Sequence, residues 1–61
     1  MEIQLIAGSG YGMLNPINLR ENGWRSDMWL QVVDSTELSY EVELPSGYRL
    51  WVVGRDIKDR R

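Results

Sequence analysis

The sequence predicts a mostly β fold, a small four-stranded, largely antiparallel sheet or small barrel with one short helix; an α+β arrangement is the alternative. Apolar and polar residues alternate without a break over residues 38–44, a turn-forming triplet follows, and residues 48–53 are rich in aromatic and β-branched side chains. A period of two is typical of a strand with one buried face, so these two segments indicate a β-hairpin. With 61 residues, the chain is expected to form a single small domain over residues 1–61.

The pairing register of the hairpin follows from the way successive side chains of a strand point to opposite faces of the sheet. A three-residue loop makes one face of the hairpin wholly apolar, adds a cross-strand ion pair on the other, and gives Gly47 the left-handed position of a type I turn with a bulge. A two-residue loop would instead place Val42 opposite Arg49, which mixes the two faces. We therefore predict the three-residue loop, with the pairs Leu44–Tyr48, Val42–Leu50, Tyr40–Val52 and Glu43–Arg49.

Two further segments have the character of strands. Residues 28–33 are expected to join the hairpin through a turn at residues 34–37, which gives a three-stranded meander. Residues 2–7 are expected to form the fourth strand, paired at an edge of the meander or between two subunits. The residues that would extend the apolar face of the hairpin are Met28, Leu30 and Val32.

A short helix is predicted between the first strand and the meander. It spans residues 15–23, with Asn15 as N-cap, Pro16 at the first helical position and Gly23 as the C-terminal stop. The alternative is a type I′ turn at Asn22 and Gly23 between two short strands.

Residue types that carry most enzyme and metal chemistry are missing. The chain has no cysteine and no histidine, so it cannot form a disulfide or hold a typical structural zinc ion. The commonest acid–base and nucleophilic side chains are absent for the same reason. Glu41 and Glu43 lie two apart on a strand, but alternating glutamates are the ordinary way to keep one face solvated. We predict no catalytic residue, no metal site, no cofactor and no enzymatic activity.

The charge distribution opposes some partners. A net charge of −2 lacks the basic field that nucleic-acid binding needs. Residues 55–61 hold four basic and two acidic residues and are expected to form a solvated, frayed terminus. No apolar run approaches the ~20 residues of a membrane span, and no signal-peptide pattern is present, so we expect a cytoplasmic protein without membrane contact.

The aromatic and arginine residues are the main candidates for a binding surface. The chain has three tryptophans and three tyrosines, and six of its seven basic residues are arginine. These residue types dominate binding hot spots. The predicted register places Trp29, Arg49 and Trp51 on the sheet face opposite the core, where they would bind a partner or a second copy. The aromatic residues expected to pack inward are Trp24, Tyr40 and Tyr48.

A second candidate site is the glycine-dense loop of residues 8–12, which follows a strand as phosphate-binding loops do. Backbone N–H groups would meet an anion, a tyrosine would cover a ring, and nearby arginines would neutralise charge. The structural alternative is a hinge or tight bend. The residues of this candidate ligand site are Gly10, Tyr11, Gly12, Arg20 and Arg25.

These observations predict a non-enzymatic binding module that acts by stoichiometric occupancy, as an inhibitor or accessory protein that occludes a protein partner. One alternative is an oligomeric protein that sequesters a small anionic or nucleotide-like ligand. Another is a single-stranded nucleic-acid-binding module, which the aromatic and arginine content favours and the net charge opposes. A homo-oligomer is expected, because a core this small lacks disulfide and metal support.

Overall fold

The protein is mostly β, as predicted, but has five strands instead of four; the computed structural model describes residues 1–61. The strands are β1 (Glu2–Leu5), β2 (Leu30–Ser35), β3 (Ser39–Glu43), β4 (Arg49–Val53) and β5 (Ile57–Arg60). The helices are α1 (Pro16–Glu21) and the 3-10 turn η1 (Gly54–Asp56) between β4 and β5. All pairings between these strands are antiparallel, and the order across the open sheet is β4-β3-β2-β1-β5.

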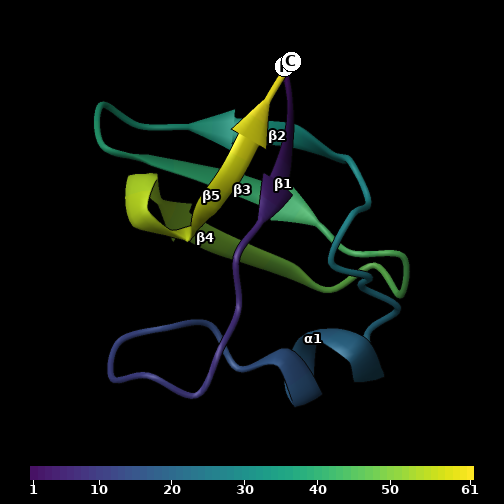
Figure 1. Ribbon diagram of the computed structural model, residues 1–61. Coiled ribbons are helices and arrows are strands. Elements are labelled where there is room, and N and C mark those ends of the chain that lie inside the picture. The colour runs from purple at the N-terminus through teal and green to yellow at the C-terminus, as the bar shows by residue number, and fades with distance from the viewer.

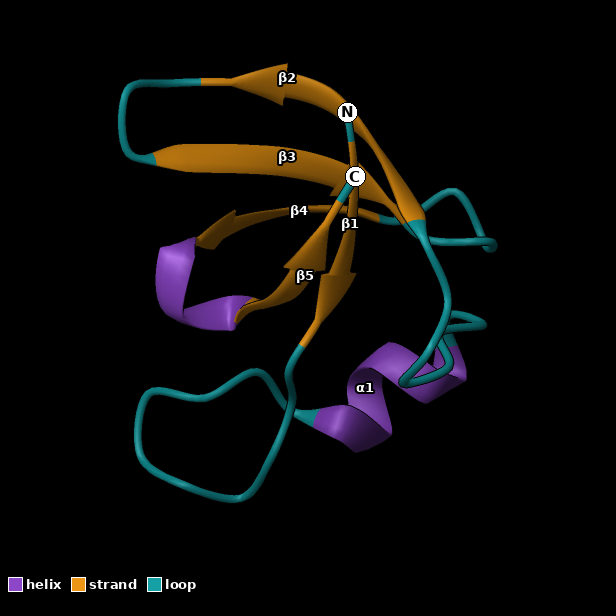
Figure 2. Ribbon diagram, turned by 45° about the horizontal axis from the view of Figure 1, so that its top comes forward, coloured by secondary structure: helices purple, strands orange, loops and turns teal.

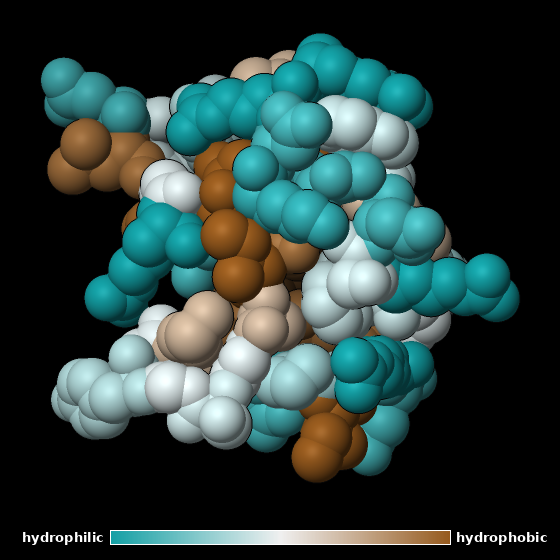
Figure 3. All heavy atoms as spheres, viewed as in Figure 1, coloured by the Kyte–Doolittle hydropathy of each residue, from teal (hydrophilic) through white to brown (hydrophobic).

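The sheet folds over on itself around its core. Figures 1 and 2 show β1 and β5 crossing the meander of β2, β3 and β4, with both chain ends side by side. Eight hydrophobic side chains, each at most 4% exposed, fill the space between these layers and α1. They are Ile3, Leu5, Leu19, Trp24, Leu30, Val42, Leu44 and Val52. Figure 3 shows hydrophobic side chains also forming a strip down the face on which β1 and β5 lie, bordered by hydrophilic ones.

The β3–β4 hairpin has the predicted three-residue loop and register. The Leu44 N–H donates to the Tyr48 carbonyl at 2.8 Å, and Arg49 pairs with Glu43 at 3.0 Å. Gly47 has a φ of +95°, the left-handed conformation that the loop requires. The remaining cross-strand pairs are Ser39–Val53, Tyr40–Val52, Glu41–Trp51 and Val42–Leu50.

The helix begins as the sequence predicts. The Asn15 side chain accepts a hydrogen bond from the Ile17 N–H at 2.9 Å, and Pro16 occupies the first turn. The type I′ alternative is excluded, because Asn22 has a φ of −101° and that turn needs two residues with positive φ.

The helix ends in a Schellman motif that directs Trp24 into the core. Gly23 has a φ of +90°, and its N–H donates to the Arg20 carbonyl at 3.0 Å. The Trp24 N–H donates to the Leu19 carbonyl, also at 3.0 Å, which completes the motif. Trp24 and Leu19 are both buried, so the helix is packed onto the sheet by Trp24 as expected.

The C-terminal segment is not the frayed tail that the sequence predicts. Ile3, Gln4 and Leu5 of β1 pair with it, and Glu2 and Arg61 exchange backbone hydrogen bonds of 2.9 and 3.0 Å. Residues 57–60 therefore form an edge strand, because β1 offers them a row of backbone partners.

Other differences concern strand ends and two side chains. The first two strands run over residues 2–5 and 30–35 instead of 2–7 and 28–33, although Met28, Leu30 and Val32 do pack on the core. Tyr48 is 47% exposed and not inward, because it lies directly before an edge strand, where no further strand covers its ring. Leu38 is also exposed, in a turn where the Thr36 hydroxyl accepts the Ser39 N–H.

No helix has the length and apolar character needed to cross a membrane.

Candidate functional site

The β4 strand forms one open edge of the sheet. Residues of an antiparallel strand alternately direct their backbone groups toward and away from the partner strand. The Val53 N–H points away from β3 and donates to the Asp56 carboxylate at 2.9 Å, which fixes the phase of this alternation. The backbone N–H and C=O groups of Arg49 and Trp51 therefore point outward as well, and no other strand pairs with them.

The exposed side chains along this edge carry little net charge. Trp51 is 47% exposed, and Val53 beside it is also exposed. Arg49 is paired with Glu43, and this hydrogen bond, followed by the charge of the carboxylate, raises the pKa of the Arg49 guanidinium. The edge thus combines unpaired backbone groups, an exposed indole and a guanidinium whose charge is compensated.

The opposite edge is built differently. β5 contributes Lys58, Asp59 and Arg60, all exposed, and its pairing with β1 is interrupted by a bulge between Gln4 and Leu5. Charged side chains, short length and bulges are the devices by which proteins prevent edge strands from pairing with other chains. β4 has a regular register over five pairs, and its protection is limited to the charge of Arg49 and to the Asp56 carboxylate, which occupies the outward N–H of Val53.

The three residues of the predicted aromatic surface do not all meet. Arg49 and Trp51 lie two residues apart on β4, with their side chains on the same face. Trp29 precedes β2, and β3 separates it from β4. Its ring is half-buried beneath the guanidinium of Arg61, 4.2 Å from the ring centre, so the C-terminal segment occupies the surface of Trp29.

The glycine loop also differs from the arrangement proposed for an anion site. Tyr11 is fully exposed, and Gly12 has a φ of +79°. The arginine that lies against this loop is Arg55, and not Arg20 or Arg25. Its guanidinium is 3.2 Å from the position that a β-carbon of Gly12 would occupy. A hollow of about 350 Å³ at the loop is lined by uncharged residues only: Gly8, Ser9, Gly10, Met13, Asn15, Pro16 and Ile17.

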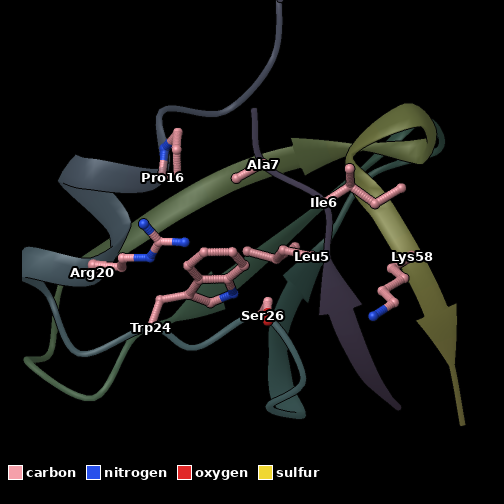
Figure 4. A pocket seen from close by; sticks show the side chains of 8 residues that line it. All are labelled: Leu5, Ile6, Ala7, Pro16, Arg20, Trp24, Ser26 and Lys58. Atoms are coloured by element: carbon pink, nitrogen blue, oxygen red, sulfur yellow. The ribbon is translucent and has the colours of Figure 1, made fainter. Parts of the chain in front are cut away.

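A larger pocket of about 450 Å³ opens between α1, the end of β1 and β5. Figure 4 shows Arg20 reaching into it from α1 and Lys58 from β5, with the Trp24 ring between them. Neither cation forms an ion pair, since the ion pairs of the protein are Arg49–Glu43 and Arg61–Glu2. The lining residues are Leu5, Ile6, Ala7, Pro16, Arg20, Trp24, Ser26 and Lys58.

Trp24, which lines the pocket, carries the one buried side-chain polar atom without a hydrogen-bond partner, its Nε1. Figure 4 shows this nitrogen on the side of the ring that faces Ser26 and Lys58. Of the lining residues, only Arg20 was a candidate from the sequence. Residues from three separate segments meet here only in the folded chain, and no sequence spacing connects them.

No three potential metal-ligating side chains gather anywhere in the protein. Comparison with known proteins does not assign a function, because no protein-family model, curated protein or solved structure matches the chain.

Proposed function

We propose that this protein is a non-enzymatic binding module that occludes a protein partner by accepting an extended segment of that partner along β4. Trp51 would contact the side chains of the added strand. Arg49, at the start of β4, would contact one end of that strand. Pairing at a sheet edge supplies affinity through main-chain hydrogen bonds and specificity through alternate side chains.

The observation that carries the proposal is the contrast between the two sheet edges. β5 is charged and its pairing is interrupted by a bulge, whereas β4 is regular, has one charged residue that is paired with Glu43, and carries an exposed tryptophan. A regular edge with little net charge is a hazard for an isolated chain, since its free backbone groups can pair with another exposed strand. Its presence is explained when a specific partner covers it.

The remaining parts of the proposal come from the sequence. A stoichiometric binder needs no catalytic group, and the chain lacks histidine and cysteine. We also propose a cytoplasmic location, which fractionation of the host cell with an antibody to the protein would test.

Photo-crosslinking tests the proposal. A benzoylphenylalanine residue placed at Trp51 should crosslink one host protein, and mass spectrometry should map the crosslink to an extended segment of that protein. Trp51→Lys should weaken binding by about tenfold or more, since it removes an aromatic anchor and adds an edge charge. Tyr11→Lys is the matched control, because this aromatic side chain is fully exposed on a loop that is not part of β4.

Hydrogen exchange distinguishes strand addition from other contacts. The amides of Arg49 and Trp51 should exchange rapidly in the free protein and become protected in the complex, whereas those of Leu50 and Val52 are already paired with β3. A partner that leaves the Arg49 and Trp51 amides unprotected, or that binds Trp51→Lys as well as the wild type, would contradict strand addition at β4.

A further inference from the structure

We infer that the pocket between α1, β1 and β5 binds a carboxylate attached to an apolar group, with Trp24 Nε1 and Lys58 recognising the carboxylate and Arg20, across the indole ring, adding to the positive charge of the pocket. The pocket uses no residue of β3 or β4, so this site is independent of the proposed strand addition.

The first argument is the unpaired indole N–H. Trp24 is only 4% exposed, and its Nε1 has no acceptor within the protein. A buried donor without an acceptor is destabilising, and buried Tyr and Trp side chains usually have a polar partner. Because Nε1 itself is buried, a ligand oxygen would supply the missing acceptor when the neighbouring side chain of Ser26, an exposed residue, moves aside.

The second argument is charge. The protein has a net charge of −2, yet the two ionised side chains that line this pocket, Arg20 and Lys58, are both cationic and have no acidic partner. They lie on either side of the Trp24 ring (Figure 4). Lys58 lies on the side of the ring that carries Nε1, so its charge attracts an anion toward the indole N–H that needs an acceptor, and the charge of Arg20 adds to the attraction from the other side.

The third argument selects the chemical class of the anion. Most of the remaining lining is apolar, with Leu5, Ile6, Ala7 and Pro16 around the indole ring. A volume of about 450 Å³ lies within the range of small-ligand pockets. An apolar body would contact these side chains, whereas inorganic phosphate would leave them uncovered. The two sources of such a group are a free small carboxylic acid and the C-terminal residue of a peptide.

Nuclear magnetic resonance tests this site directly, because each tryptophan has its own indole N–H signal. Hexanoate represents the free acid and N-acetylleucine the peptide C-terminus, and hexanol and N-acetylleucinamide are their uncharged counterparts. We expect at least one acid to move the Trp24 indole signal downfield in a saturable titration, with smaller changes at Trp29 and Trp51. Binding of hexanoate alone identifies a small-acid site, and binding of N-acetylleucine alone identifies a peptide-terminus site.

Two variants test the recognition of charge. Arg20→Gln and Lys58→Gln should each raise the dissociation constant by about fivefold, the size of effect that an exposed ion pair can give. Arg25→Gln is the matched control, since Arg25 is exposed, has no ion pair and does not line the pocket. The inference fails if neither acid shifts the Trp24 signal, or if the uncharged analogues or inorganic phosphate bind as tightly. It also fails if Arg25→Gln weakens binding as much as the two pocket variants.

Discussion

At the scale of single residues, two glycines with the same backbone conformation stand in different surroundings. Gly23 and Gly47 have φ values of +90° and +95°. A β-carbon on Gly47 would meet no atom within 4 Å, whereas one on Gly23 would lie 2.8 Å from Cβ of Pro45. The helix end is thus packed against the hairpin turn, and the Ser46 N–H donates to the Asn22 carbonyl at 3.1 Å across the same contact.

This difference predicts graded effects of alanine. Gly47→Ala should lower the free energy of unfolding by about 1–2 kcal/mol, the cost of a left-handed conformation for a residue with a β-carbon. Gly23→Ala should cost more, because the clash with Pro45 adds to the same strain. Gly54→Ala is the control, since its φ is not in this region and its surroundings are open. Urea denaturation measures all three, and equal losses for Gly47→Ala and Gly54→Ala would contradict the explanation.

The aromatic residues mark the limit of sequence prediction at this scale. The alternation of side chains along the hairpin predicts that Tyr48 and Leu44 both face the core. The prediction is correct for Leu44, which is buried. It fails for Tyr48, because burial at the start of an edge strand depends on what covers the edge. Likewise, the alternation of side chains predicts that Trp29 lies on the outer face, but it does not predict that Arg61 covers its ring.

At the scale of elements, the hairpin and helix were predictable because their signals are local. Loop length and alternation determine the β3–β4 register, and a cap, a proline and a glycine determine α1. β5 lacks such a signal, since three of its four residues are charged. It is a strand because β1 offers unpaired backbone groups and because Arg60 and Arg61 lie over aromatic rings, 5.5 Å from Tyr40 and 4.2 Å from Trp29. The carboxylate pocket was equally unpredictable, because it requires this strand to bring Lys58 into the same pocket as Trp24.

The C-terminal strand should therefore contribute to stability. Deletion of Arg60 and Arg61 removes the last pairings with β1, the ion pair with Glu2 and both cation–π contacts. We expect a loss of at least about 2 kcal/mol, since cation–π contacts alone are worth about 0.5–1 kcal/mol each at exposed sites. Lys58→Gln, an exposed position without an ion pair, should change stability by less than about 0.5 kcal/mol. A deletion that leaves the thermal unfolding midpoint unchanged would mean that this segment is frayed after all.

At the scale of the whole molecule, the core is small for a protein that stands alone. Eight buried hydrophobic side chains support 61 residues, without a disulfide or a metal cluster. The 29 backbone hydrogen bonds are fewer than the roughly 40 expected for this length. Both features indicate a narrow stability margin, which a contact with another chain would widen.

The prediction that follows is self-association at micromolar concentration when no other partner is present. β4 is the expected contact, because its outward backbone groups can pair with those of a second copy and its one charged residue is already neutralised by Glu43. The thermal unfolding midpoint should rise with protein concentration, and sedimentation should give a mass above that of one chain. Trp51→Lys should yield monomers, since a lysine on an edge strand opposes pairing, while Lys58→Gln on the other edge should leave the mass unchanged. A monomer mass combined with a midpoint that is constant over a hundredfold dilution would show that the small core is sufficient and that β4 remains free for its partner.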